Sequence, residues 1–345
     1  MIGIRDLARY LDISIGTVSR ALNGKADVNR ETRQRVMEAA AALGYTPNQS
    51  GRSLRKGTTG LVGVIVPSDP DQTLVDSVFA AVLDGLHRFL STQGLDLAIF
   101  LYSEEEDAFT VLRRIAGRRV VDALIISQTQ LNDPRIDFLA GRSIPFVAFG
   151  RSQLARDHSW VDMDFADAVD RSVERLARLG HRHIAVFVPQ GDINYSHVIA
   201  DQFRVCLIRL GLEGGAADIY RCGRGEGGGY AAASALLARQ DRATAVLTAD
   251  RKLAIGLYKR LNEAGLVPGR DIAVICLNCD DQAQFLTPVL TSFQSDLAVV
   301  GHELGRALWA AIAQAKIGLP PEQGFVHALV PVRFRAGGSD GPAGT

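Results

Sequence analysis

Hydrophobic residues in the first fifty positions recur at helical spacing in three short stretches. The first predicted helix has its apolar side at Ile4, Leu7, Ala8 and Leu11. After a turn at Asp12 and Ile13, Ser14 stands where an N-cap is favoured, because its hydroxyl can accept a backbone hydrogen bond. The second predicted helix then places Val18 and Leu22 toward a small core. Asn29 is suited to cap a third helix, which we expect to end at Gly44, with apolar positions at Val36, Ala39, Ala40 and Leu43.

From residue 60 the pattern changes to short apolar strands that alternate with longer amphipathic stretches. Strands are predicted at LVGVIV, LDLAIFL, DALIIS and PFVAFG, and after a break at 151–159 again at HIAVFV, 218–222, AVLTA and DIAVICL. Helices are predicted between them, near 74–93, 107–117, 165–179, 196–210, 229–239 and 251–264. This βαβ alternation predicts an α/β protein with two similar lobes, each a doubly wound parallel sheet covered by helices.

The chain therefore divides into a three-helix head at 1–47, a linker at 48–59 and a two-lobe core at 60–335. We expect the segment SFQSDLAVV to cross between lobes and to lead into a helix that returns to the first lobe. The first lobe is predicted to comprise about 60–155 and 295–320, and the second about 156–290 and 325–335, with a final pair of strands near 326–335. The Gly-rich tail at 336–345 is predicted to be disordered.

Charge is distributed unevenly, although the whole chain is formally neutral with 38 basic and 38 acidic residues. The first sixty residues hold ten Lys or Arg against five Asp or Glu, so the remainder carries the compensating acidic excess. A helix pair of this size in a basic segment is typical of heads that place one helix in a DNA groove. The sequence thus predicts a helix-turn-helix DNA-binding head on a body with little affinity for phosphates.

Cysteine usage and hydropathy predict a cytoplasmic protein. The cysteines are too few and too scattered for a disulfide scaffold and are expected to be reduced and mostly buried: Cys206, Cys222, Cys276 and Cys279. No apolar run approaches the roughly 20 residues that a membrane-spanning helix needs. The first predicted helix also begins too early for a signal peptide.

Three patterns resemble catalytic or metal-binding motifs. The glycines of 223–228 fit G-x-G-x-x-G, but they fall late in the chain and lack a following strand that ends in an acid, which favours a Gly-rich turn. Cys276 and Cys279 have redox spacing, but they lie in and just after a buried strand, which favours inert thiols. His181 and His183 alternate at a strand entrance, which favours a structural turn over a zinc site. We expect no catalytic residue, no metal and no cofactor.

Several segments resemble the LacI/GalR family of bacterial repressors. They are TVSRALNG at 17–24, V-x-x-x-T-R-x-x-V at 28–36, LGYTPN at 43–48 and the later segments GLVPGRDIAV and TPVLTSFQ. The resemblance spans nearly the whole chain. It implies a periplasmic-binding-protein-like core that holds a small effector between its lobes, and a homodimer that represses transcription from a pseudo-palindromic operator. The effector expected from this resemblance is a carbohydrate or a derivative of one.

The resemblance also assigns residues to DNA. It makes Ile15–Leu22 the recognition helix, with Ile15, Gly16 and Arg20 at base-reading positions, and Arg20 suited to a guanine edge. Shorter polar groups at the groove rim are Thr17, Ser19 and Asn23. The linker resembles a hinge segment that folds into a short helix in the minor groove, where Leu54 would intercalate and Gly51 replaces the usual alanine. The hinge residues assigned to DNA are Asn48, Ser50, Gly51, Leu54, Arg55 and Lys56.

For the effector, the resemblance points to loops that follow the core strands. The positions are Pro67, Asp71, Gly150, Tyr195, Ile199, Arg224, Asp250, Lys252 and Asn278. Ile199 stands where the family usually has an arginine, and Asn278 with Cys279 replaces a common Asp-Asp pair. Two other classes of protein remain open from the residues alone: a sugar-handling or dinucleotide-dependent enzyme fused to a helix-turn-helix head, and an architectural DNA-binding protein that needs no ligand.

Overall fold

A computed structural model describes residues 3–22, 24–25, 27–45, 58–67, 77–102, 106–154, 156–213, 215–317 and 324–344. The chain forms two compact units, Met1–Gly60 and Leu61–Thr345. The first unit is the head and the second is the core. None of the helices in the described part of the chain combines the length and the apolar character that crossing a bilayer requires.

The head contains α1 (Ile4–Leu11), α2 (Ile15–Leu22) and α3 (Arg30–Ala42). The predicted caps are confirmed: Ser14 Oγ accepts from the backbone N–H of Thr17 at 3.0 Å, and Asn29 Oδ1 accepts from that of Thr32 at 2.7 Å. The helices enclose one small core, whose fully buried side chains include Leu7, Val18 and Val36. This core fixes the face that α2 presents to solvent.

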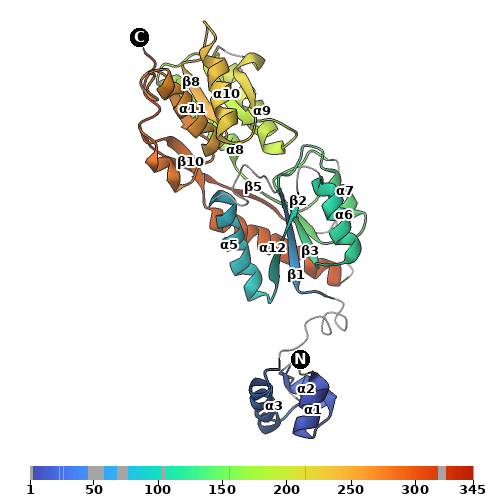
Figure 1. Cartoon of the computed structure of the whole chain (residues 1–345). Coiled ribbons are helices and arrows are strands. Elements are labelled where there is room, and N and C mark those ends of the chain that lie inside the picture. The colour runs from blue at the N-terminus through green and yellow to red at the C-terminus, as the bar shows by residue number, and fades with distance from the viewer. Residues whose placement is uncertain are drawn as a thin grey trace. The chain divides into compact units, whose positions relative to one another are not determined.

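One sheet of the core defines the first lobe, and its strands run parallel in the order β11-β5-β4-β3-β1-β2. The strands are β1 (Leu61–Pro67), β2 (Asp96–Tyr102), β3 (Ala123–Ile126), β4 (Phe146–Phe149), β5 (Trp160–Met163) and β11 (His327–Val330). On one face pack α5 (Ser77–Thr92) and α12 (Leu297–Lys316), and on the other α6 (Ala108–Arg118) and α7 (Pro134–Ala140) (Figure 1). Side chains of β1 alternate between the faces, because Val64 joins one buried cluster and Ile65 the other.

The other sheet defines the second lobe, in the order β12-β10-β9-β8-β6-β7. Its strands are β6 (Ile184–Pro189), β7 (Ile219–Cys222), β8 (Ala245–Thr248), β9 (Ala273–Cys276), β10 (Thr291–Ser295) and β12 (Val332–Arg335), of which β12 is antiparallel to β10. Helix α8 (Phe165–Arg178) packs against α9 (Asn194–Leu210), and α10 (Gly225–Leu237) packs against α11 (Arg251–Glu263). Short 3-10 turns lie at Ala216–Asp218 and Asp281–Phe285.

The lobe boundaries differ from those expected. The sequence placed everything from 156 to 290, and both final strands, in the second lobe, but β5 and β11 pair with each other in the first sheet. The chain therefore crosses between the lobes at Asp164, at Asp296 and again at Pro331. The error has a physical cause, because the buried Asp162 interrupts the apolar run of β5, whereas the equally short β3 is apolar throughout.

The expected disorder of the C-terminal tail is wrong for its described residues. Ser339 Oγ donates to the carbonyl of Val274 at 2.7 Å, and Asp340 Oδ1 accepts from Thr291 Oγ1 at 2.6 Å. Both tail side chains are buried against the second lobe. The glycines explain the failure, since a Cβ on Gly337 would overlap the carbonyl oxygen of Val289. Here a Gly-rich composition allows close backbone packing.

Candidate nucleic-acid interface and ligand cleft

The predicted recognition helix α2 turns its assigned base-reading residues to solvent. Ile15, Gly16 and Arg20 are exposed, whereas Val18 and Ala21 on the opposite side are buried. A rigid helix with one face locked into the head and the other bare is the arrangement that groove recognition needs.

Arg20 has a partner that it can exchange. Its Nε lies 3.4 Å from Asp27 Oδ2, and the two side chains are 52% and 60% exposed. An ion pair this exposed contributes only about 0–1 kcal/mol, so a guanine edge or a phosphate can replace the carboxylate at little cost. Asp27 therefore orients the guanidinium of Arg20 through an ion pair that is weak enough to be exchanged.

Gly16 is not required by packing inside the head. An added Cβ would lie 3.6 Å from Ser14 Oγ, which is ordinary van der Waals contact. Since glycine costs a helix roughly 1 kcal/mol relative to alanine, its presence here suits close approach to a partner surface.

Of the other residues assigned to DNA, the structure describes only Thr17 and Ser19. Thr17 and Ser19 are half-buried, and Thr17 Oγ1 is hydrogen-bonded to Ser14 Oγ at 2.8 Å as part of the cap. The remaining ones lie outside the described residues and stay predictions: Asn23, Asn48, Ser50, Gly51, Leu54, Arg55 and Lys56.

A cavity of about 310 Å³ opens in the core between the carboxyl ends of the strands of both sheets. From the first lobe it is lined by residues that include Pro67, Phe79, Gln128, Thr129, Phe149, Gly150 and Asp162. From the second lobe the lining includes Tyr195, Arg224, Asp250, Arg251, Lys252 and Asn278. Of the positions assigned to the effector, the structure thus gathers Pro67, Gly150, Tyr195, Arg224, Asp250, Lys252 and Asn278 around one space.

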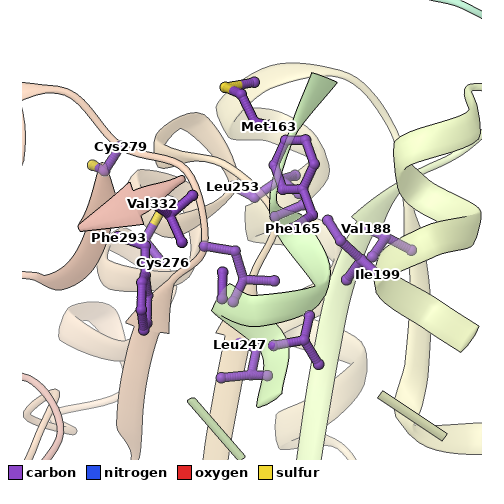
Figure 2. Packing of buried hydrophobic residues seen from close by; sticks show 14 of the residues in the cluster. Met163, Phe165, Val188, Ile199, Leu247, Leu253, Cys276, Cys279, Phe293 and Val332 are labelled. Carbon is purple, nitrogen blue, oxygen red and sulfur yellow. The ribbon is translucent and has the colours of Figure 1, made fainter. Parts of the chain in front are cut away.

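Ile199 does not belong to this cavity, which corrects its assignment. Its side chain is fully buried inside the second lobe, beside Val188 (Figure 2). An isoleucine in the place of a polar clamp residue is drawn into the core, because burying its apolar surface is favourable. Asp71 lies outside the described residues.

Aromatic rings line the cavity from both lobes. Phe165, at the start of α8, stacks on Tyr195 of α9 with ring centroids 5.3 Å apart and planes at 23°. Phe79 and Phe149 line the first-lobe side. Flat apolar faces of this kind suit a ligand with an apolar ring face.

Asp162 is a cavity residue that the sequence reasoning missed. It is buried, Oδ2 accepts from Arg151 Nε at 2.9 Å, and Oδ1 accepts from the backbone N–H of Met163 at 2.9 Å. Burial raises the pKa of this carboxyl, and the nearby Arg151 guanidinium opposes the rise. In the sequence, the only indication of this role is that Asp162 is a single acidic residue between the apolar residues Val161 and Met163.

The loop after β3 was also missed, although it follows the carboxyl end of a parallel strand, as Gly150 does after β4. Ser127 Oγ donates to the carbonyl of Ile65 at 2.8 Å, and Thr129 Oγ1 donates to that of Phe149 at 2.9 Å. The buried Arg135 adds a hydrogen bond from Nη2 to the carbonyl of Ser127 at 3.0 Å. This loop is therefore a fixed wall of the cavity.

The patterns that resembled catalytic motifs have structural explanations. Arg224 is the N-cap of α10, and a Cβ on Gly228 would overlap the carbonyl oxygen of Gly223, so this Gly-rich turn serves packing. The cysteines are free and buried, as expected, and burial raises the pKa of Cys206 and Cys222 to about 12. His183 Nε2 lies 2.8 Å from Asp218 Oδ1, and His181 Nδ1 lies 2.9 Å from Thr244 Oγ1.

Comparison with known proteins agrees with this arrangement. Residues 3–48 match bacterial regulatory proteins of the lacI family, and residues 173–331 match a periplasmic binding protein-like domain. The chain is 33% identical to the HTH-type transcriptional regulator AglR of Rhizobium meliloti (strain 1021), over 97% of this chain and 94% of AglR.

Two solved structures show the same fold. One is the lac repressor dimer bound to operator and the anti-inducer ONPF, with a TM-score of 0.84, 22% identity and 98% of each chain covered. The other is the complex of the transcriptional regulator CelR with cellobiose, with a TM-score of 0.71, 23% identity, and 98% of this chain and 100% of that one covered. AglR, which aligns with nearly the whole chain, is a transcriptional regulator, and this finding removes the enzyme alternative. The chain is thus a transcriptional regulator, and it belongs to the lacI family of bacterial regulatory proteins.

Proposed function

We propose that this regulator is a homodimeric repressor that binds a pseudo-palindromic operator and is controlled by a carbohydrate, or a derivative of one, in the core cavity. It acts in the cytoplasm, where the chromosome is. The observation that carries the proposal is α2, whose assigned base-reading residues face solvent while its other side is locked into the head. The solved lac repressor dimer on its operator supports the same use of the fold.

An apolar sheet edge supports dimerisation. Strand β2 lies at one edge of the first sheet, and its side chains Ile99 and Leu101 are exposed. An uncovered apolar edge is an aggregation hazard, so a second subunit that covers it is the simplest solution. Two-fold symmetry in the protein then predicts two related half-sites in the operator.

The lining of the cavity supports a polyhydroxylated ligand. Asp162, Asp250 and Asn278 bring carboxylate and amide groups that can pair with hydroxyls, and Phe165 and Tyr195 supply apolar faces. The bound cellobiose of CelR, a protein of the same fold, agrees with this class of ligand. Ligand contacts from both lobes would favour one lobe arrangement, and a coupling of about 1–3 kcal/mol to DNA affinity is enough to change operator occupancy.

Replacing Asn278 with alanine should weaken ligand binding without affecting the fold. A screen of neutral mono- and disaccharides by thermal shift on the full chain identifies the ligand. Loss of one hydrogen bond of about 0.5–1.5 kcal/mol should then raise Kd roughly two- to tenfold. Asn262→Ala, in the exposed surface of α11, is the matched control. Equal affinities in the two variants would remove Asn278 from the site.

Replacing Arg20 with alanine should relax base preference at one position in each half-site. A bidentate arginine–guanine contact supplies about 1–3 kcal/mol of discrimination, and in vitro selection on a randomised duplex measures its loss. Lys56→Ala, in the predicted hinge, should instead lower the affinity for all DNA sequences alike. It should also reduce the slope of log affinity against log salt concentration by about one. A loss of discrimination equal in both variants would contradict these roles.

A further inference from the structure

Arginines of the first lobe fall into two groups. Within the described residues, most pair with a carboxylate: Arg88–Asp84, Arg114–Glu106, Arg135–Asp133, Arg151–Asp162, Arg156–Asp137 and Arg306–Glu303. The others are Arg113, Arg118, Arg119 and Arg142, all exposed and without an ion pair to a described carboxylate. The unpaired arginines lie on α6 and just after α7, so they form a local basic patch on a body whose overall acidic excess predicts little affinity for phosphates.

Three of these arginines converge on one hollow. Arg113, Arg119 and Arg142 line a groove of about 450 Å³, together with Phe138, Ile144, Ala116 and Gly117. No acidic residue is among the described residues that line it. Guanidinium groups that share one hollow repel one another, and a bound anion relieves that repulsion.

Aromatic rings hold two of the guanidinium groups. That of Arg142 lies 3.9 Å from the ring centroid of Phe138, and that of Arg113 lies 5.7 Å from that of Phe109. A guanidinium stacked on a ring keeps its N–H donors free at its edge, the geometry with which arginine binds phosphates. The stacking also reduces the side-chain freedom lost on binding.

Helix dipoles explain only part of this arrangement. Arg118 and Arg119 lie at the C-terminus of α6, where a cation gains about 0.3–1 kcal/mol, and Arg142 follows the C-terminus of α7. Arg113 lies earlier in α6, too far from the C-terminus of the helix to be stabilised by its dipole. The dipoles also give no reason for these side chains to line a common groove.

The groove lies near the amino ends of β1 and β3. The backbone N–H of Asp122, three residues after Arg119, donates to the carbonyl of Leu61 at 2.8 Å, and Leu61 begins β1. The carbonyl of Pro145, three residues after Arg142, accepts from the N–H of Leu124 at 3.0 Å. The head precedes Leu61 in the chain, so the start of β1 is the point of the core to which the head is covalently connected.

We propose that the groove formed by Arg113, Arg119 and Arg142, with Arg118 beside it, binds backbone phosphates of the DNA that flanks the sequence read by the head. This inference rests on the proposed function. The contact carries no sequence information; it adds affinity by displacing condensed counterions, with a salt-dependence slope of about 0.9 for each phosphate neutralised.

The test compares two double variants of the full-length chain on a random-sequence duplex several helical turns long. In Arg119→Gln/Arg142→Gln, the slope of log affinity against log KCl should become shallower by about 1.8, or about 0.9 for each lost contact. Arg88→Gln/Arg306→Gln removes the same charge from exposed, paired arginines of the same lobe and should keep the wild-type slope. Circular dichroism and melting temperature confirm that both variants fold.

The outcomes distinguish a failure of the groove proposal from a failure of the proposed function. If Arg119→Gln/Arg142→Gln binds DNA and keeps the wild-type slope of log affinity against log KCl, the groove does not bind phosphates of DNA, and the proposed function stands. If inorganic phosphate raises the melting temperature of the wild type but not of this variant, and the slopes are equal, the groove is a small-anion site and the DNA assignment is wrong. A wild-type chain that binds no duplex overturns both.

Discussion

Gly256→Ala should lower the melting temperature of the core by about 6 to 12 °C, which corresponds to roughly 3 kcal/mol of unfolding free energy. Gly256 lies on α11, where an added Cβ would overlap the carbonyl oxygen of Glu226 and lie 2.5 Å from the backbone N of Tyr230. Both atoms belong to the backbone of α10, so the clash cannot be relieved by a rotamer change. The two helices must separate, and thermal denaturation of the full chain measures the cost.

Gly227→Ala supplies the control within the same helix pair. Gly227 lies on α10, and an added Cβ there would have no heavy atom within 4 Å. Since alanine is favoured over glycine in a helix by about 1 kcal/mol, this variant should be neutral or slightly more stable. Similar losses in the two variants would refute close backbone packing as the reason for Gly256.

Arg135→Met should cost about 3–5 kcal/mol of unfolding free energy, because it leaves the carboxylate of Asp133 buried without its partner. The side chain of Arg135 is 7% exposed and that of Asp133 is fully buried, with Nη2 to Oδ2 at 2.6 Å. Arg135 also holds the loop that lines the cavity, through the carbonyl of Ser127. Ligand binding should therefore weaken together with stability, as chemical denaturation and ligand titration would show.

Arg88→Met tests whether burial is the cause. Arg88 pairs with Asp84 at 2.9 Å, but its side chain is 77% exposed, so its loss should cost less than about 1 kcal/mol. Equal losses for Arg135→Met and Arg88→Met would mean that water reaches the buried pair and screens it.

Periodicity and capping residues predicted the head almost residue for residue, because Ser14 and Asn29 mark their helix starts chemically. The family resemblance likewise indicated most of the residues that line the cavity, including Gly150 and Asn278. Local patterns fail where tertiary packing decides, as with β5, whose apolar run is interrupted by the buried Asp162.

The remaining errors concern the direction of side chains and the role of glycine. A sequence position cannot say that Ile199 faces the inside of its lobe, because that depends on how α9 packs against β6 and α8. The same limit hid the buried Asp162 of β5. Gly337 indicated disorder by composition, yet its missing side chain is what allows the tail to pack against Val289.

The crossing at Pro331 has a consequence for synthesis of the protein. Both sheets receive a last edge strand from residues 327–335, β11 on one and β12 on the other. On the ribosome neither sheet can be completed until residues 327–335 have emerged. A message truncated before this point yields a head attached to two incomplete sheets, and proteases should remove such fragments before they accumulate as heads without a complete core.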